Sequence, residues 1–226
     1  MLQYLQNLFQ ALDFQSMGDA VLRVAAVFLC LTIHETCHGL AAYVLGDPTA
    51  KARHRLSLNP LRHVDLLGLL MMFTVGFGWA KPVPVNPHYF RKPKQGMAVT
   101  ALAGPISNFI LAVLSMFISS LIYRYAPYSA AWNVAFQFFL FQLTPLSIGL
   151  GLFNLIPIPP LDGSRLLLAL LPYKQYYALM RYERYIFWGL IALLYLGVLD
   201  VPLAFLTNAV MQGLSSIAKI PFMFFL

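Results

Sequence analysis

Long apolar stretches limit how this chain can fold more than any other feature of its sequence. Only 10% of the residues are charged and 60% are apolar, whereas a soluble domain has about 25% charged residues. So few charges do not cover the surface of a water-soluble globule, and the many aromatic residues exclude a disordered chain. Four stretches have the roughly 20 residues that cross a bilayer as a helix: 21–45, 97–123, 132–156 and 186–206. The sequence therefore predicts an all-α polytopic membrane protein with about four to six transmembrane helices.

The segments between these stretches are expected to be shorter or irregular. Residues 66–79 are apolar but too few to cross the bilayer easily, which indicates a re-entrant or interfacial segment. The prolines that follow favour extended chain at residues 83–85. We expect a short helix from residue 162 to 171 and an interfacial helix over residues 1–19, and the sequence leaves open whether residues 209–226 cross. No signal peptide is expected, because the first 22 residues contain no Lys or Arg.

The formal net charge of +7 is concentrated in three segments. Residues 47–65, 80–96 and 158–184 each contain four Lys or Arg residues, whereas residues 124–131 contain one. Basic loops of membrane proteins face the cytoplasm, so we expect these three segments on the cytoplasmic side of the plasma membrane. The anionic cytoplasmic surface of the lipid bilayer then accounts for the positive net charge of the chain. No nucleic-acid partner is expected, and the sequence does not indicate an oligomeric state.

Three ionisable residues interrupt the first apolar stretch in the order H-E-x-x-H, which is His34, Glu35 and His38. On a helix, positions i and i+4 lie on one face, so two imidazoles there can bind one Zn²⁺. The glutamate beside the first histidine can then act as general base towards a zinc-bound water. The alternative is a buried polar cluster that packs against other helices, but ionisable residues inside a span are costly and mark function.

A catalytic zinc has three protein ligands and one open position, so a third ligand is needed. Asp162 is a candidate because it follows a proline-rich break at the end of the third apolar stretch. The alternative interpretation is a helix N-cap, since Asp before Gly163 suits helix initiation. With two histidines lacking a third ligand, metal binding is the favoured interpretation.

These motifs together resemble the site-2 protease family of intramembrane zinc metalloproteases. That family has H-E-x-x-H in one transmembrane helix and N-x-x-P-x-x-x-x-D-G in a later one, and residues 154–163 here read N-L-I-P-I-P-P-L-D-G. Residues 103–108 (A-G-P-I-S-N), 46–48 (G-D-P) and 57–60 (S-L-N-P) also match the family. The similarity covers about residues 20–172 and is closest to the minimal branch, which lacks PDZ and CBS domains.

The resemblance implies a fold, an activity and a set of site residues. The whole chain, 1–226, would form one membrane-embedded metalloprotease domain, with its catalytic core at about 20–172 and a further transmembrane region at 173–226. It would use one catalytic zinc to hydrolyse peptide bonds in or near transmembrane segments of membrane proteins, with its site towards the cytoplasm. The implied site consists of the ligands His34, His38 and Asp162, the base Glu35, and Asn154 and Asn108 as substrate-positioning or oxyanion-stabilising residues.

The resemblance also implies that residues 66–85 form a re-entrant β element, to which an extended substrate could add as a strand. One departure is visible here, because Asp65 is followed by Leu66, whereas minimal members often have proline at that place. His54, His63 and His88 are expected to be solvated or hydrogen-bonded loop histidines, with an accessory metal or pH-sensing role as the alternative.

Two other classes of function fit the sequence less well. A proteolytically inactive zinc-binding scaffold is disfavoured, because it would not need the intact Glu35. A transporter is disfavoured further, because many transporters have two related halves and no second half with a similar motif is found.

Overall fold

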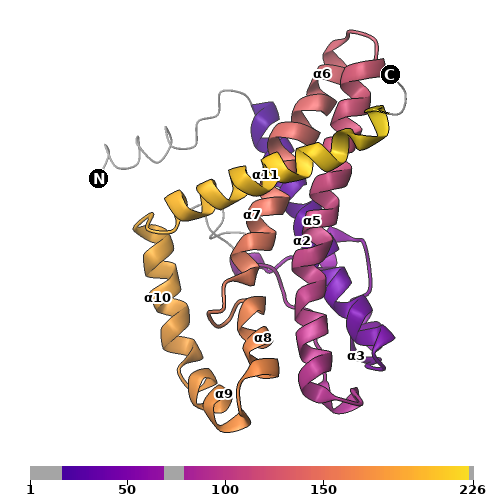
Figure 1. Ribbon diagram of the computed structural model, residues 1–226. Helices are drawn as coiled ribbons and strands as arrows, with labels where there is room; N and C mark the ends of the chain where they lie inside the picture. The colour runs from indigo at the N-terminus through magenta and orange to yellow at the C-terminus, as the bar shows by residue number, and fades with distance from the viewer. Residues whose placement is uncertain (1–16, 69–78, 224–226) are drawn as a thin grey trace.

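The computed structural model describes residues 17–68 and 79–223, and these are largely helical (Figure 1). Helix α2 (Met17–Val44) packs along α5 (Pro93–Tyr125), and α5 packs along a third long helix over residues 130–155. These three are long and apolar enough to cross a membrane. The structure thus confirms the all-α polytopic membrane fold predicted from the apolar stretches.

The third long helix contains a π-helical turn. It consists of α6 (Ala130–Gln137), the π-helical segment η3 (Phe138–Leu143) and α7 (Thr144–Leu155). Pro145 lacks the N–H that an α-helix would need there, so the hydrogen-bond ladder changes register. The Phe139 carbonyl accepts hydrogen bonds from the hydroxyls of Thr144, at 2.7 Å, and Ser115, at 2.6 Å. The latter bond ties this helix to α5.

The predicted continuous span over residues 186–206 is wrong. Within the described residues, four helices follow the third span: α8 (Asp162–Leu170), α9 (Tyr173–Met180), α10 (Glu183–Tyr195) and α11 (Asp200–Met223). The last two meet at an angle of 81° across a short break, so together they form one broken span or a re-entrant pair. Gly197 in this break has φ +69°, a conformation that ends a helix. The structure therefore has three spanning helices among its described residues, or four if this pair counts as one.

The chain between α2 and α5 contains the short helices α3 (Thr49–Ala52), η1 (Pro60–Arg62) and η2 (Pro87–Tyr89). Val64 and Ala80 form an antiparallel bridge, and residues 81–86 continue from it without helix or strand. Of the predicted β element at 66–85, the described part of the chain is helical at residues 66–68, contributes Ala80 to this bridge, and is irregular at residues 81–85. Residues 69–78, and residues 1–16 of the predicted interfacial helix, lie outside the described residues.

The basic segments gather at one end of the long helices (Figure 1). Helix α3, the first turn of α5 and helix α9 lie near the lower end of the view, whereas the turn between α5 and α6 lies at the upper end. The segment 124–131, with its single arginine, is therefore opposite the three segments that carry four basic residues each.

Candidate metal centre

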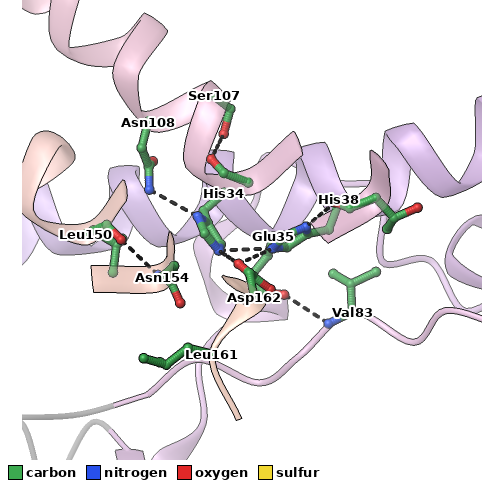
Figure 2. A network of polar contacts seen from close by, with 12 residues as sticks. His34, Glu35, His38, Val83, Ser107, Asn108, Leu150, Asn154, Leu161 and Asp162 are labelled. Atoms are coloured by element: carbon green, nitrogen blue, oxygen red, sulfur yellow. Dashed lines mark hydrogen bonds and ion pairs between the residues drawn. The ribbon is translucent and has the colours of Figure 1, made fainter. Parts of the chain in front are cut away.

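Two histidines of α2 and an aspartate of α8 converge on one point (Figure 2). The Nε2 atoms of His34 and His38 lie 3.0 Å apart. The Oδ2 atom of Asp162 lies 3.0 Å from the first and 3.1 Å from the second. The carboxylate reaches the histidines because α8 begins directly after the proline-rich break and packs against α5. Residues that are 128 positions apart in the sequence thus present three ligand atoms to each other.

The donor set fits a zinc ion. A tetrahedral zinc with Zn–N bonds of about 2.0–2.1 Å holds its ligand atoms about 3.3 Å apart. The three atoms here are 3.0 to 3.1 Å apart, which is close to one face of such a tetrahedron. They form a group that could hold a metal ion, with both histidines buried and the aspartate partly buried. Two imidazoles and one carboxylate also leave the fourth position open, as in catalytic zinc sites.

The far side of each imidazole ring is held by α5. His38 Nδ1 lies 2.7 Å from the carbonyl oxygen of Thr100 and must donate to it, so the Nε2 atom of a neutral ring carries the lone pair that a metal needs. The Nδ2 atom of Asn108 lies 3.0 Å from His34 Nδ1, and its Oδ1 atom has no hydrogen-bond partner among the described residues. Metal binding by His34 Nε2 requires a proton on Nδ1, and therefore the amide orientation in which the oxygen of Asn108 accepts it.

Gly104 of α5 lies directly against both imidazole rings. A Cβ atom at this position would overlap the imidazoles of both His34 and His38. The glycine therefore allows α5 to lie directly against the candidate ligands. Gly104 is not among the site residues predicted from the sequence, although it lies in the A-G-P-I-S-N stretch that matches the family.

Asp162 does not cap its own helix. Leu161 is the N-cap residue of α8, and no side chain caps this helix end. The carboxylate of Asp162 is instead directed at the two histidines (Figure 2). The capping interpretation of this residue is therefore wrong, and the structure places it where the metal-binding interpretation requires.

Glu35 lies next to the three candidate metal ligands, and one of its carboxylate oxygens accepts a hydrogen bond. Its Oε2 atom accepts a hydrogen bond of 2.9 Å from the backbone N–H of Val83. No hydrogen bond of Oε1 is found within the described part of the chain. Glu35 lines a cavity of about 870 Å³, which His34, His38 and Asp162 also line. The carboxylate of Glu35 therefore faces the same cavity as the three candidate ligands.

The two predicted asparagines lie in different places. Asn154 of α7 lines the cavity, and its Nδ2 atom donates to the Leu150 carbonyl at 3.0 Å, which leaves one amide proton for another acceptor. Asn108 is fully buried and does not line the cavity. Its predicted contact with substrate does not agree with this position, because the ring of His34 separates it from the three donor atoms (Figure 2). The structure favours a role in orienting His34.

The three loop histidines also differ. His63 is 2% exposed and lies 2.7 Å from the Ser57 carbonyl, to which its Nε2 donates. His54 and His88 are exposed. These positions agree with solvated or hydrogen-bonded loop histidines, and in the described part of the chain none of the three belongs to a group of metal-ligand residues.

Known proteins with similar sequences are zinc metalloproteases by name. The chain is 41% identical over 150 residues to the "Putative zinc metalloprotease YwhC" of Bacillus subtilis, a match that covers 66% of this chain and 68% of that protein. A model of peptidase family M50 matches residues 118–196, which include Asn154 and Asp162. The chain belongs to peptidase family M50, the site-2 protease family of zinc metalloproteases.

More distant relatives agree with this assignment. The "Putative zinc metalloprotease Rip2" of Mycobacterium tuberculosis is 34% identical over 151 residues, which is 65% of this chain and 56% of that protein. The "Zinc metalloprotease MJ0392" of Methanocaldococcus jannaschii is 34% identical over 85 residues, which is 38% of this chain and 23% of that protein. The chain thus spans just over half the length of its mycobacterial relative. No solved structure matches it significantly.

Proposed function

We propose that this M50 protein is an intramembrane zinc metalloendopeptidase that hydrolyses peptide bonds in or near transmembrane segments of other membrane proteins. The observation that carries the proposal is the convergence of His34, His38 and Asp162 beside Glu35, on a cavity lined mostly by apolar side chains. One ion is proposed, because the described residues contain one such group of donors.

Each site residue has a distinct role in the proposed reaction. A zinc ion held by His34, His38 and Asp162 would supply a Lewis acid that makes a water molecule acidic enough to give hydroxide near neutral pH. Glu35 takes the proton at its Oε1 atom and later gives it to the leaving nitrogen of the peptide. The remaining amide proton of Asn154 donates to the carbonyl oxygen as negative charge develops on it.

The cavity suits an apolar peptide in extended form. Its walls include the apolar residues Phe28, Leu31, Leu146, Leu150 and Phe153 of α2 and α7, and Phe187, Leu190 and Leu203 of α10 and α11. A substrate helix must unwind to react, because its peptide carbonyls are occupied by helical hydrogen bonds. The breadth of this cavity, which reaches from the α10–α11 pair to the candidate ligands, supports binding of such an unwound segment.

The proposed location is the plasma membrane, with the site towards the cytoplasm. The H-E-x-x-H motif lies in the second half of α2, nearer the end of the bundle where α3 and the other basic segments gather (Figure 1). Basic loops favour the cytoplasmic side, which supports this orientation. The partners are then the bilayer itself and a membrane-spanning protein substrate.

Co-expression with candidate substrates tests the proposed function. A panel of tagged single-span proteins is expressed with the wild-type enzyme or with Glu35→Gln, and the loss of full-length substrate is followed. Gln is nearly isosteric with Glu but does not take up the proton, so Glu35→Gln is expected to keep zinc and to leave every substrate intact. The proposal fails if zinc-loaded wild type leaves the whole panel uncut, or if Glu35→Gln cuts as well as wild type.

A further inference from the structure

The segment that precedes α5 lies against the catalytic motif through its main chain. We call residues 81–86, with the sequence K-P-V-P-V-N, the strap. At its centre, the N–H of Val83 donates to Glu35 Oε2 at 2.9 Å (Figure 2). A hydrogen bond to a carboxylate is stronger than one between neutral groups, so this contact fixes one oxygen of the side chain that we propose as the base.

Hydrogen bonds hold the strap in place on both sides of Val83. Lys81 donates its N–H to the His63 carbonyl at 2.8 Å, and its own carbonyl accepts from Arg55 Nη2 at 2.5 Å. Asn86 donates its N–H to Oδ2 of Asp47 at 2.6 Å, and Asp47 has no exposed surface. The loop after α2 therefore holds the strap at its two ends, and the position of Val83 is determined by more than its own hydrogen bond.

Packing and proline chemistry single out Val83 within the strap. Its side chain is buried against Gly39, one helical turn after Glu35, where a Cβ atom would lie 3.1 Å from Val83 Cγ1. Pro82 and Pro84 flank it and have no N–H to donate. A proline also keeps the residue before it out of the helical region. Val83 thus presents an N–H group to α2 from a backbone that the sequence itself keeps extended.

We propose that the backbone N–H of Val83 is a positioning group for Glu35. It holds Oε2, so that Oε1 is the oxygen presented for proton transfer and the carboxylate does not swing away from the three metal-ligating side chains. This inference rests on the proposed function, because it assigns Glu35 the part of base. Val83 lines the same cavity, but its N–H is bound to Glu35 and acts through that carboxylate. Losing the N–H should therefore slow turnover without weakening the binding of substrate or metal.

Labelling can observe the hydrogen bond without any activity measurement. The chain contains only two Pro–Val peptide bonds, Pro82–Val83 and Pro84–Val85. Protein with ¹³C-carbonyl proline and ¹⁵N-valine therefore gives two carbonyl-filtered amide signals. Within the described residues the N–H of Val85 has no hydrogen-bond acceptor, so it is an internal control. In Glu35→Ala the Val83 amide proton is expected to move upfield while that of Val85 stays; a Val83 signal that also stays overturns the proposal.

Turnover of the full-length enzyme gives the second measurement. Val83→Pro removes the N–H and is expected to lower kcat about 10- to 100-fold, the range for a lost hydrogen bond to a charged group, with KM and zinc content unchanged. Val83→Ala keeps the N–H and should lose much less kcat than Val83→Pro. Val85→Pro is the matched control, because it places the same change at an N–H for which the described part of the chain offers no acceptor.

The outcomes separate this inference from the proposed function. If Val83→Pro does not fold, an ester bond in place of the Val83 amide, introduced with the hydroxy-acid analogue of valine, removes only the N–H and should give the same loss of kcat. Wild-type turnover in the ester variant, or an equal loss in Val85→Pro, overturns the positioning role even though the enzyme is a protease. An inactive wild type with full zinc contradicts the proposed function, and the labelling experiment still decides whether Val83 holds Glu35.

Discussion

Gly104 leaves no space between α5 and the imidazole of His38. A Cβ atom on this glycine would lie 2.5 Å from both Cε1 and Nε2 of the ring, and 2.6 Å from Cε1 of His34. Cβ atoms in proteins essentially never come within 3.0 Å of such atoms. The missing side chain therefore allows α5 to pack directly against both candidate ligands, which the Thr100 carbonyl and the Asn108 amide of the same helix also contact.

Gly104→Ala is expected to lower zinc occupancy, because the added methyl group must push one or both imidazoles out of place. Zinc content of the purified protein, measured by atomic emission, checks this. Gly189→Ala in α10 is the matched control, since a Cβ atom there meets nothing within 4 Å and alanine favours a helix. If Gly104→Ala kept full zinc and activity, the close approach of α5 would not be needed for the site.

Asp162→Ala is expected to reduce zinc occupancy strongly and Asp162→Asn less so, because asparagine keeps one oxygen in place but loses the charge. Helix α8 should remain, since Asp162 provides no cap for it. Metal analysis and far-ultraviolet circular dichroism together check this prediction. Unchanged zinc in Asp162→Ala would mean that the carboxylate is not a ligand, whatever its distance from the histidines.

The sequence predicted the spans and the site motifs because both depend on local pattern. Apolar length determines which residues cross a bilayer, and H-E-x-x-H on a helix brings His34 and His38 together without any tertiary contact. The break between α10 and α11 was not predicted because residues 196–199 are as apolar as a span, apart from the aspartate that follows. A single glycine does not reveal from sequence that it adopts a positive φ.

The contacts that orient His34, Glu35 and His38 were also not predicted, for a different reason. The Thr100 carbonyl and the Val83 N–H are main-chain groups, so no side-chain type marks them in a sequence. Asn108 was found, but its role was assigned to substrate because sequence alone does not give the side of the histidine on which it lies. Tertiary packing determines these roles, and one sequence contains no direct signal for them.

Asn108→Leu is expected to weaken zinc affinity about 10- to 100-fold, as changes behind a metal-ligating histidine do. Asn108→Asp should retain the metal, because a carboxylate also accepts the proton of His34 Nδ1. Zinc affinity measured in competition with a chelator checks both variants. The opposite order, with zinc kept in Asn108→Leu and lost in Asn108→Asp, would contradict an acceptor role for this side chain.

Single cysteines at exposed positions can test which end of the bundle faces the cytoplasm. In intact cells, cysteines replacing Arg53 and Lys92 are expected to be protected from a membrane-impermeant thiol reagent, and one replacing Tyr128 is expected to react. All three side chains are exposed, and the native Cys30 and Cys37 lie inside the apolar α2. Reaction at position 92 with protection at position 53 would mean that residues 66–79 cross the bilayer.

Asn154→Leu is expected to retain zinc and helical content and to cleave about 10²- to 10³-fold more slowly, the loss seen when one oxyanion-stabilising donor is removed. Its amide already donates to the Leu150 carbonyl, so a purely structural role is the competing explanation. In an α-helix the Leu150 carbonyl also accepts the backbone N–H of residue 154. Leucine keeps this N–H, so α7 should remain folded. Single-turnover rates, zinc content and elution on size exclusion are measured together. If zinc and monodispersity fell in proportion to activity, Asn154 would stabilise the end of α7 and not the transition state.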